Sequence, residues 1–139
     1  MRKSVFAILV SLVVTSFVSA QYKENLQTGK IYFLRSTGLP ASGNGFKMFI
    51  DDKFVCKLNN KKYSVHEVAV GKHNCFVKEK KKESGESAEK FEVEAGKITY
   101  GQLICEVGLF KSYRLYCEEV AEDLAKKKIE KMSEDTKCL

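Results

Sequence analysis

Residues 46–77, FKMFIDDKFVCKLNNKKYSVHEVAVGKHNCFV, carry the pattern that decides the fold. Apolar and polar side chains alternate from Phe46 to Ile50, and this period of two is typical of a strand with one buried face. Asp51-Asp52-Lys53 predicts a hairpin turn, although the glycine that such turns prefer is missing, and Phe54–Leu58 predicts the returning strand. A second turn leads to an extended run at residues 63–70. We therefore expect consecutive strands joined by short turns.

The same signals predict strands on both sides of this unit. β-branched and aromatic residues favour strands, and Gly71 and Gly96 can adopt the positive φ of a sharp turn into a strand. Between these two glycines lies the lysine-rich stretch 78–90, which we interpret as the solvated tip of a hairpin, with a docking patch for an anionic partner as the alternative. Additional strands are expected at residues 30–35, 73–80, 98–107 and 109–117.

The pattern changes period near the C-terminus. Apolar residues there recur at helical spacing and form one stripe, Ala121, Leu124, Ala125, Ile129 and Met132. Acidic residues gather early in this segment and lysines late, an arrangement that the helix dipole stabilises. We expect an amphipathic helix over residues 118–132 that lays its apolar stripe on a sheet. The fold class is therefore mainly β: an antiparallel β-sandwich of about seven strands with one C-terminal α-helix, and an open barrel as the alternative.

The N-terminus has the form of a secretory signal peptide. Two basic residues precede an apolar run at residues 5–14, and the small residues before Ala20 predict cleavage between Ala20 and Gln21. The run is shorter than the about 20 residues of a typical membrane-spanning helix. An uncleaved anchor is the alternative, and no stable membrane span is expected after cleavage. We expect a signal peptide at residues 1–20, a polar lead-in at 21–29 and one domain at 30–139, in a protein that is periplasmic or secreted.

The charge pattern argues against a nucleic-acid-binding protein. The sequence has 24 lysines and arginines and 18 aspartates and glutamates. Loss of the two basic residues of the signal peptide reduces the net charge to 22 − 18, or +4. Lysines alternate with glutamates over most of the chain, whereas nucleic-acid binding requires a patch of one sign with interleaved aromatic residues. The pattern indicates a solvated surface.

Five cysteines would enter an oxidising compartment, so disulfide bonds are expected and at least one thiol is left over. Cys138 lies in the tail after the expected helix, and Cys117 ends the last expected strand. The helix carries the chain about 22 Å away and the tail can span about 20 Å back, so Cys138 can just reach Cys117. Cys56 is an equal candidate if the helix lies antiparallel across its strand. We expect Cys138 to be paired and to fasten the helix to the sheet, while Cys75 and Cys105 are buried thiols or a second bridge.

The sequence holds few residues suited to catalysis. His66 and His73 are its two histidines. His73 and Cys75 are two residues apart and share a face of a strand, so they form, with Cys56, a conceivable three-ligand metal site. Structural zinc sites usually have four ligands at closer spacing, and the alternative is a partly buried His73 beside an apolar-like Cys75. Without a nucleophile motif, a phosphate-binding loop or an H-E-x-x-H zinc motif, we expect no enzyme, no bound metal and no cofactor.

Several segments together resemble the DUF2846 family, a group of exported bacterial domains of unassigned function. They are KIYFLR, FIDDKFVCKLNNKKYSVHEV, VGKHNCFV, EAGKITYGQL and YCEEVAEDLAKK, and they span about residues 30–131. Their shared elements are an arginine flanked by aromatic residues in the first strand, an Ile-Asp turn, and two Gly-Lys strand starts, the first followed by His73. The resemblance implies a small β-sandwich similar to PEGA or prealbumin modules, which serve as structural units or contact proteins and carbohydrates. It implies no catalytic residues.

Three functions are compatible with these observations. The first is a non-catalytic structural or protein-interaction module of the cell envelope, whose partner is an envelope protein or a glycan. Its candidate contact surface is an aromatic edge near Tyr32, Phe49, Tyr63 and Tyr100, with core packing as the alternative role of most of these residues. The second is a small-ligand or carbohydrate-binding domain that uses tyrosines exposed on one sheet face. The third is a thiol- or metal-dependent enzyme centred on His73, Cys75 and Cys56. We favour the first, because the β pattern is well formed and no catalytic motif accompanies it.

Overall fold

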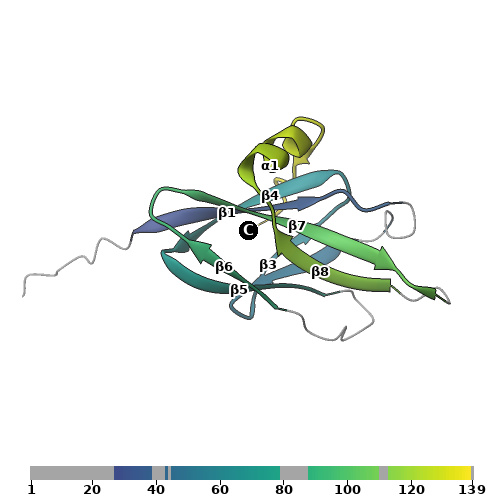
Figure 1. Cartoon of the computed structure of the whole chain (residues 1–139), viewed down its shortest axis with the longest axis horizontal. Coiled ribbons are helices and arrows are strands. Elements are labelled where there is room, and N and C mark those ends of the chain that lie inside the picture. The colour runs from purple at the N-terminus through teal and green to yellow at the C-terminus, as the bar shows by residue number, and fades with distance from the viewer. Residues whose placement is uncertain (1–26, 39–42, 44, 79–87, 110–112, 139) are drawn as a thin grey trace, which may run out of the picture.

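The computed structural model describes residues 27–38, 43, 45–78, 88–109 and 113–138. Within these residues the chain forms two packed sheets and one helix (Figure 1). The five-stranded sheet has the order β8-β7-β1-β4-β9, and the four-stranded sheet has the order β3-β2-β5-β6. The strands are β1 (Thr28–Arg35), β2 (Phe46–Ile50), β3 (Lys53–Leu58), β4 (Lys62–Ala69), β5 (Gly71–Lys78), β6 (Glu89–Val93), β7 (Ile98–Val107), β8 (Tyr113–Glu119) and β9 (Ser133–Glu134), and the helix is α1 (Glu122–Ile129).

The core lies between the two sheets and follows from the alternation of side chains along the strands. On β2 the side chains of Phe46, Met48 and Ile50 are buried, as the period of two requires. Phe91 of β6 packs so close to β7 that a Cβ at Gly101 would lie 2.5 Å from its ring, which explains the glycine at that position. The apolar inner faces therefore hold the layers together.

The fold is mainly β and sandwich-like, as predicted, but the number of strands and the direction of two pairings differ from the prediction. β6 and β9 raise the number of strands above the expected seven. Two pairings, β1 with β7 and β4 with β9, are parallel, so the five-stranded sheet is mixed rather than purely antiparallel. The first parallel pairing arises because β1 is inserted at the centre of its sheet, between β4 and β7.

The helix is shorter than predicted. It spans Glu122–Ile129 instead of residues 118–132, because Glu118 and Glu119 continue β8 opposite β7. Figure 1 shows α1 on the outer face of the five-stranded sheet, where Ala125 packs with Leu34 and Tyr100. Leu124, which the apolar stripe placed against the sheet, is 49% exposed. The shortened helix therefore buries a narrower face than expected.

The domain boundaries shift slightly at the start of the fold. β1 begins at Thr28, so Thr28 and Gly29 belong to the domain and not to the predicted lead-in. The predicted signal peptide and its cleavage site lie outside the described residues, as do most of the expected lead-in and residues 79–87 of the lysine-rich stretch. In the part of the chain that the structure describes, the helix is too short and too polar to cross a bilayer.

Candidate functional site: a cleft beneath an open strand edge

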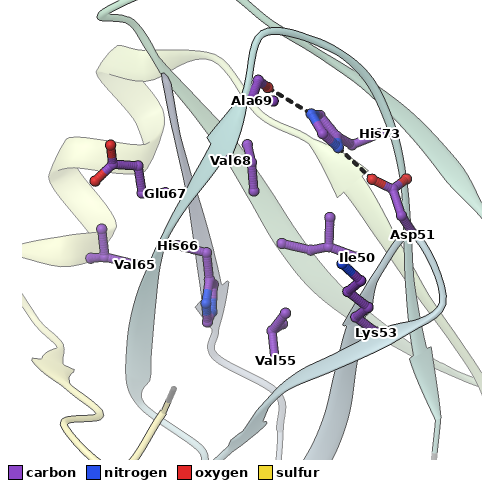
Figure 2. Close-up of a pocket in the computed structure, with 10 residues that line it drawn as sticks. All are labelled: Ile50, Asp51, Lys53, Val55, Val65, His66, Glu67, Val68, Ala69 and His73. Carbon is purple, nitrogen blue, oxygen red and sulfur yellow. Dashed lines mark hydrogen bonds and ion pairs between the residues drawn. The ribbon is translucent and has the colours of Figure 1, made fainter. Parts of the chain in front are cut away.

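The chain passes from the four-stranded to the five-stranded sheet at β4, and a cleft lies under this strand. Its sequence neighbours β3 and β5 both flank β2 in the four-stranded sheet, whereas β4 pairs with β1 in the five-stranded sheet. The cleft between β4 and the β2–β3 hairpin has a volume of about 580 Å³ (Figure 2). Its lining is apolar at the centre and polar at the rim, and consists of Ile50, Asp51, Lys53, Val55, Val65, His66, Glu67, Val68, Ala69 and His73.

His73 closes one end of the cleft by linking the two sheets. Its Nδ1 lies 2.6 Å from Oδ2 of Asp51 in the β2–β3 turn, and its Nε2 lies 2.7 Å from the carbonyl oxygen of Ala69 on β4 (Figure 2). Both partners are acceptors, so the ring fits best as an imidazolium that donates from both nitrogens. The other carboxylate oxygen of Asp51 accepts the backbone N–H of Asn74. The positive φ of Asp51, 47°, belongs to the tight turn that presents this carboxylate.

The pKa values of this pair move in opposite directions. Burial opposes the charge of His73, but the Ala69 carbonyl, the hydrogen bond to Asp51 and the charge of Asp51 outweigh it and raise the pKa of His73 above its ordinary value. Burial also opposes the charge of Asp51, yet its hydrogen bonds with Asn74 and His73 and the nearby positive charges lower the pKa of that carboxyl. Both shifts favour the ionised form of the pair.

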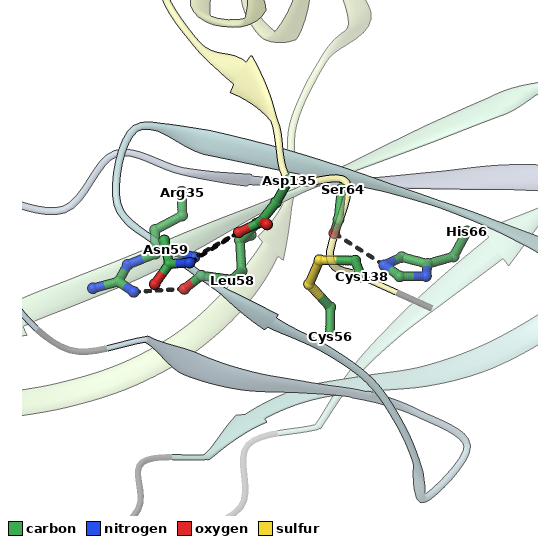
Figure 3. Close-up of a disulfide and its surroundings, with 8 residues drawn as sticks. All are labelled: Arg35, Cys56, Leu58, Asn59, Ser64, His66, Asp135 and Cys138. Carbon is green, nitrogen blue, oxygen red and sulfur yellow. Dashed lines mark hydrogen bonds between the residues drawn. A yellow bond between two sulfur atoms is a disulfide. The ribbon is translucent and has the colours of Figure 1, made fainter.

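A disulfide and a buried carboxylate form a second link between the sheets, next to Val55 and Val65 of the cleft. After β9 the chain crosses from the five-stranded sheet to β3, where Cys138 is bonded to Cys56 (Figure 3). Asp135, which is 4% exposed, accepts hydrogen bonds from the side chain and the backbone N–H of Asn59 at the β3–β4 corner. The backbone N–H of Asp135 donates to the carbonyl of Tyr63. This tail ties the sheets together beside the cleft.

A buried arginine also stabilises the β3–β4 corner. Arg35 is fully buried at the end of β1, with its guanidinium carbon 3.9 Å from the centre of the Phe46 ring. It donates to the carbonyl of Leu58 and contacts Oγ1 of Thr37. Burial lowers the pKa of Arg35 to about 10, so the group stays charged at neutral pH. The arginine of the sequence motif is thus an anchor of the β3–β4 corner.

One edge of β4 is open over the cleft. Alternate residues of an antiparallel strand direct their backbone groups to the partner strand and away from it. The carbonyls of Tyr63 and Ala69 point away from β1, since they accept from Asp135 and His73. Val65 and Glu67 follow the same alternation, and in the described part of the chain no hydrogen bond reaches their backbone groups on that side. Two N–H and two C=O groups on this side therefore have no hydrogen-bond partner among the described residues.

The three candidate metal ligands do not come together. Cys56 is in the disulfide, Cys75 is fully buried in the core, and His73 is engaged with Asp51 and Ala69. Among the described residues no group of three His, Cys, Asp or Glu side chains could hold a metal ion. His73 and Cys75 lie two residues apart on β5, but His73 contacts Asp51 and Ala69 at the rim of the cleft, whereas Cys75 is buried in the core.

The free thiols of Cys75 and Cys117 pack in the hydrophobic core. Cys117, the other predicted partner of Cys138, is buried in the core, and burial raises its pKa well above the ordinary value. Burial likewise raises the pKa of Cys75 to about 12. Neither thiol would form an appreciable amount of the nucleophilic thiolate at neutral pH. Cys105 also keeps its thiol and is partly buried on β7.

The four residues of the predicted aromatic edge do not form one edge but lie on opposite sides of the sandwich. Tyr32 contacts both Tyr63 and Tyr100 on the outer face of the five-stranded sheet, in the cluster that packs with α1. Phe49 instead stacks on Phe76 at 4.9 Å between ring centres, on the outer face of the four-stranded sheet. Phe54 meets Phe49 edge-on and is 46% exposed. The tyrosines thus support the helix, and Phe49, Phe54 and Phe76 form a separate phenylalanine cluster.

The fold and the cleft define a small two-sheet module with an open strand edge. Residues 24–111 match the DUF2846 family, which is described as a protein of unknown function, and the chain therefore belongs to that family. The match ends before β8, so α1, β9 and Cys138 lie outside it, whereas the sequence resemblance had been expected to extend to residue 131. No match was found among curated proteins.

The disulfide predicts a specific loss of stability. Because the bridge closes a loop between residues separated by 82 positions, Cys138→Ser should lower the free energy of unfolding by about 2–4 kcal/mol, measured by urea denaturation. Reductant should lower the stability of the wild type to the same level and leave Cys138→Ser unchanged. Thiol titration of the denatured wild type should detect Cys75, Cys105 and Cys117 only. Equal stability of the wild type and the variant would contradict this role.

The His73–Asp51 contact predicts a dependence of stability on pH. A raised pKa in the folded state stabilises the protein below the unfolded pKa of about 6.5, and this stabilisation is lost as the pH rises through the folded value. The lowered pKa of Asp51 stabilises the protein above about pH 4 and is lost in acid. Unfolding midpoints between pH 5 and 9 should therefore decline more steeply for the wild type than for His73→Gln.

Titration of the ring protons by NMR measures the same effect directly. The pKa of His73 should lie above 6.5 in the wild type and should fall in Asp51→Asn, which removes the negative charge beside the ring. A His73 pKa at or below 6.5 in the wild type would refute the imidazolium assignment.

Proposed function

We propose that this chain is an exported, non-catalytic protein-interaction module of the cell envelope. The observation that carries the proposal is the open edge of β4 above an apolar cleft that two cross-sheet links hold in shape. Exposed strand edges are sites at which other chains pair, and proteins usually cover or interrupt them. Here the edge is presented by a rigid frame with the disulfide on one side and His73 on the other.

The chemistry of the candidate catalytic groups supports a non-catalytic role. A general base needs an unoccupied nitrogen lone pair, whereas both ring nitrogens of His73 contact acceptors. A nucleophilic cysteine needs a low pKa, whereas burial raises the pKa of Cys75 and Cys117. Export is supported by the predicted signal peptide at residues 1–20 and by the Cys56–Cys138 disulfide, which is typical of oxidising compartments.

A second candidate function, binding of an acidic glycan, is favoured by the phenylalanine cluster. The exposed ring of Phe54, supported edge-on by Phe49, which stacks on the buried Phe76, offers an apolar surface to the face of a sugar. Lys78 lies 5.0 Å from the centre of the Phe76 ring and brings a positive charge to the same surface. The cleft combines an apolar lining with the open edge of β4, so we rank the phenylalanine cluster second.

Site-specific photo-crosslinking in the producing cells tests the interaction module. A photoreactive residue at Lys53, on the rim of the cleft, should crosslink one envelope protein in amounts comparable to the domain itself. The matched control carries the same residue at Lys90, an exposed lysine on β6 at the opposite edge of the four-stranded sheet. Crosslinks from both positions in equal amounts, or from neither, would count against the proposal.

Titration with acidic oligosaccharides tests the second candidate. If the phenylalanine cluster binds sugar, Phe54→Ala should weaken binding by about tenfold or more, because aromatic truncations dominate such surfaces. Leu124→Ala, which removes a similarly exposed apolar side chain from α1, should leave the affinity unchanged. Absence of chemical-shift changes at Phe49, Phe54 and Phe76 would end this alternative.

A further inference from the structure

We propose that the open edge of β4 binds an extended peptide segment of another protein by strand addition, with apolar side chains of that segment seated in the cleft. This inference rests on the proposed interaction function and names the form of the partner. The bound segment would pair with Val65 and Glu67 and lie between Asp135 and His73.

The chain itself already uses this mode of pairing at the same edge. β9 lies beside Lys62 and Tyr63 as a parallel strand, held by hydrogen bonds from Ser133 to the Lys61 carbonyl and from Asp135 to the Tyr63 carbonyl. The ladder then stops, because the chain turns after Asp135 toward the disulfide on β3. An added strand would therefore continue a sheet edge at the point where the tail leaves it.

The unused groups match an extended backbone. Val65 and Glu67 each direct one N–H and one C=O away from β1, at the spacing of alternate residues in a strand. The open stretch lies between the Asp135 contact at Tyr63 and the His73 contact at Ala69. Its residues, 64–68, span about 17 Å at 3.3 Å per residue. A segment of about five extended residues would fill it and satisfy four backbone groups. Such groups are directional, so they favour a peptide over a compact small molecule.

The side-chain preference follows from the cleft. Successive side chains of a strand point to opposite faces. Every second side chain of the added strand would therefore enter the cleft under β4, and the side chains between them would face solvent. The floor of this space is formed by Ile50, Val55 and Val68, with the buried His66 beside them (Figure 2). The volume of about 580 Å³ accommodates two medium-sized apolar side chains. We expect a peptide with β-branched or aromatic residues at alternate positions.

Selection from a random octapeptide display library against the purified protein tests this inference. The selected peptides should carry alternate apolar residues, and the strongest should bind the wild type measurably in solution. Val65→Pro removes one outward N–H and places a ring against the incoming strand, so it should weaken binding by about tenfold or more. Val65→Ala keeps the N–H and should change the affinity less than about twofold, which makes it the matched control.

Amide hydrogen exchange of the wild type provides a readout that does not depend on a folded variant. On addition of the selected peptide, the amides of Val65 and Glu67 should become protected, whereas those of Phe49 and Phe76 should not change. Protection elsewhere with unchanged Val65 and Glu67 amides, equal binding by Val65→Pro and the wild type, or failure to select any peptide would overturn strand addition. A concentration-dependent dimer that Val65→Pro dissociates would assign the edge to a second copy and would also overturn it.

The two proposals fail separately. A partner that crosslinks to Lys53 in cells but binds Val65→Pro as well as the wild type would preserve the interaction module and refute pairing with β4. Loss of that crosslink in Val65→Pro, but not in Val65→Ala, would support both.

Discussion

The structure depends on keeping its two sheets together beneath β4. β4 does not lie in the sheet of its sequence neighbours β3 and β5 but pairs with β1 in the other sheet. The cleft therefore separates β4 from the β2–β3 hairpin. Two links of different chemistry hold this side in place. The Cys56–Cys138 bond is covalent and fixes the tail, while His73 joins Asp51 to Ala69 by charge-assisted hydrogen bonds. Together they maintain both the core and the cleft.

The alternation of apolar and polar residues, together with the turn residues, was sufficient to predict strands that pair with strands nearby in the sequence. The β2–β3 hairpin and the long strand β7 lie where alternation and turn residues indicated. The end of β8 and the length of α1 could not be read in this way, because Glu118 and Glu119 have helix-compatible side chains and become strand only by pairing with β7. The parallel pairing of β1 with β7 likewise depends on which strands become adjacent, and periodicity carries no information about that.

In the candidate site, too, the sequence predicted local motifs but not the contacts between distant residues. The Ile-Asp turn and the Gly-Lys-His strand start were recognised as separate motifs, yet their contact joins residues 22 positions apart and requires the register that sets Ile50 opposite Cys75. The choice of Cys56 over Cys117 as the partner of Cys138 follows from the path of β9, a two-residue strand too short to produce a sequence signal. Val65 and Glu67 were missed because an open backbone edge leaves no trace in side-chain identity.

The central position of β1 has a consequence for how the chain reaches this structure. The strand formed from the earliest part of the domain pairs on one side with β4 and on the other with β7, so that Lys30 lies opposite Ile98. Contacts between such distant residues must close long loops before they yield any stabilisation, and topologies of high contact order fold slowly. An N-terminal fragment ending before β7 would leave the β7 edge of β1 unpaired and would lack the core side chains of Leu103, Leu115 and Cys117. The domain is therefore a single cooperative unit that becomes stable only when nearly all of it is present.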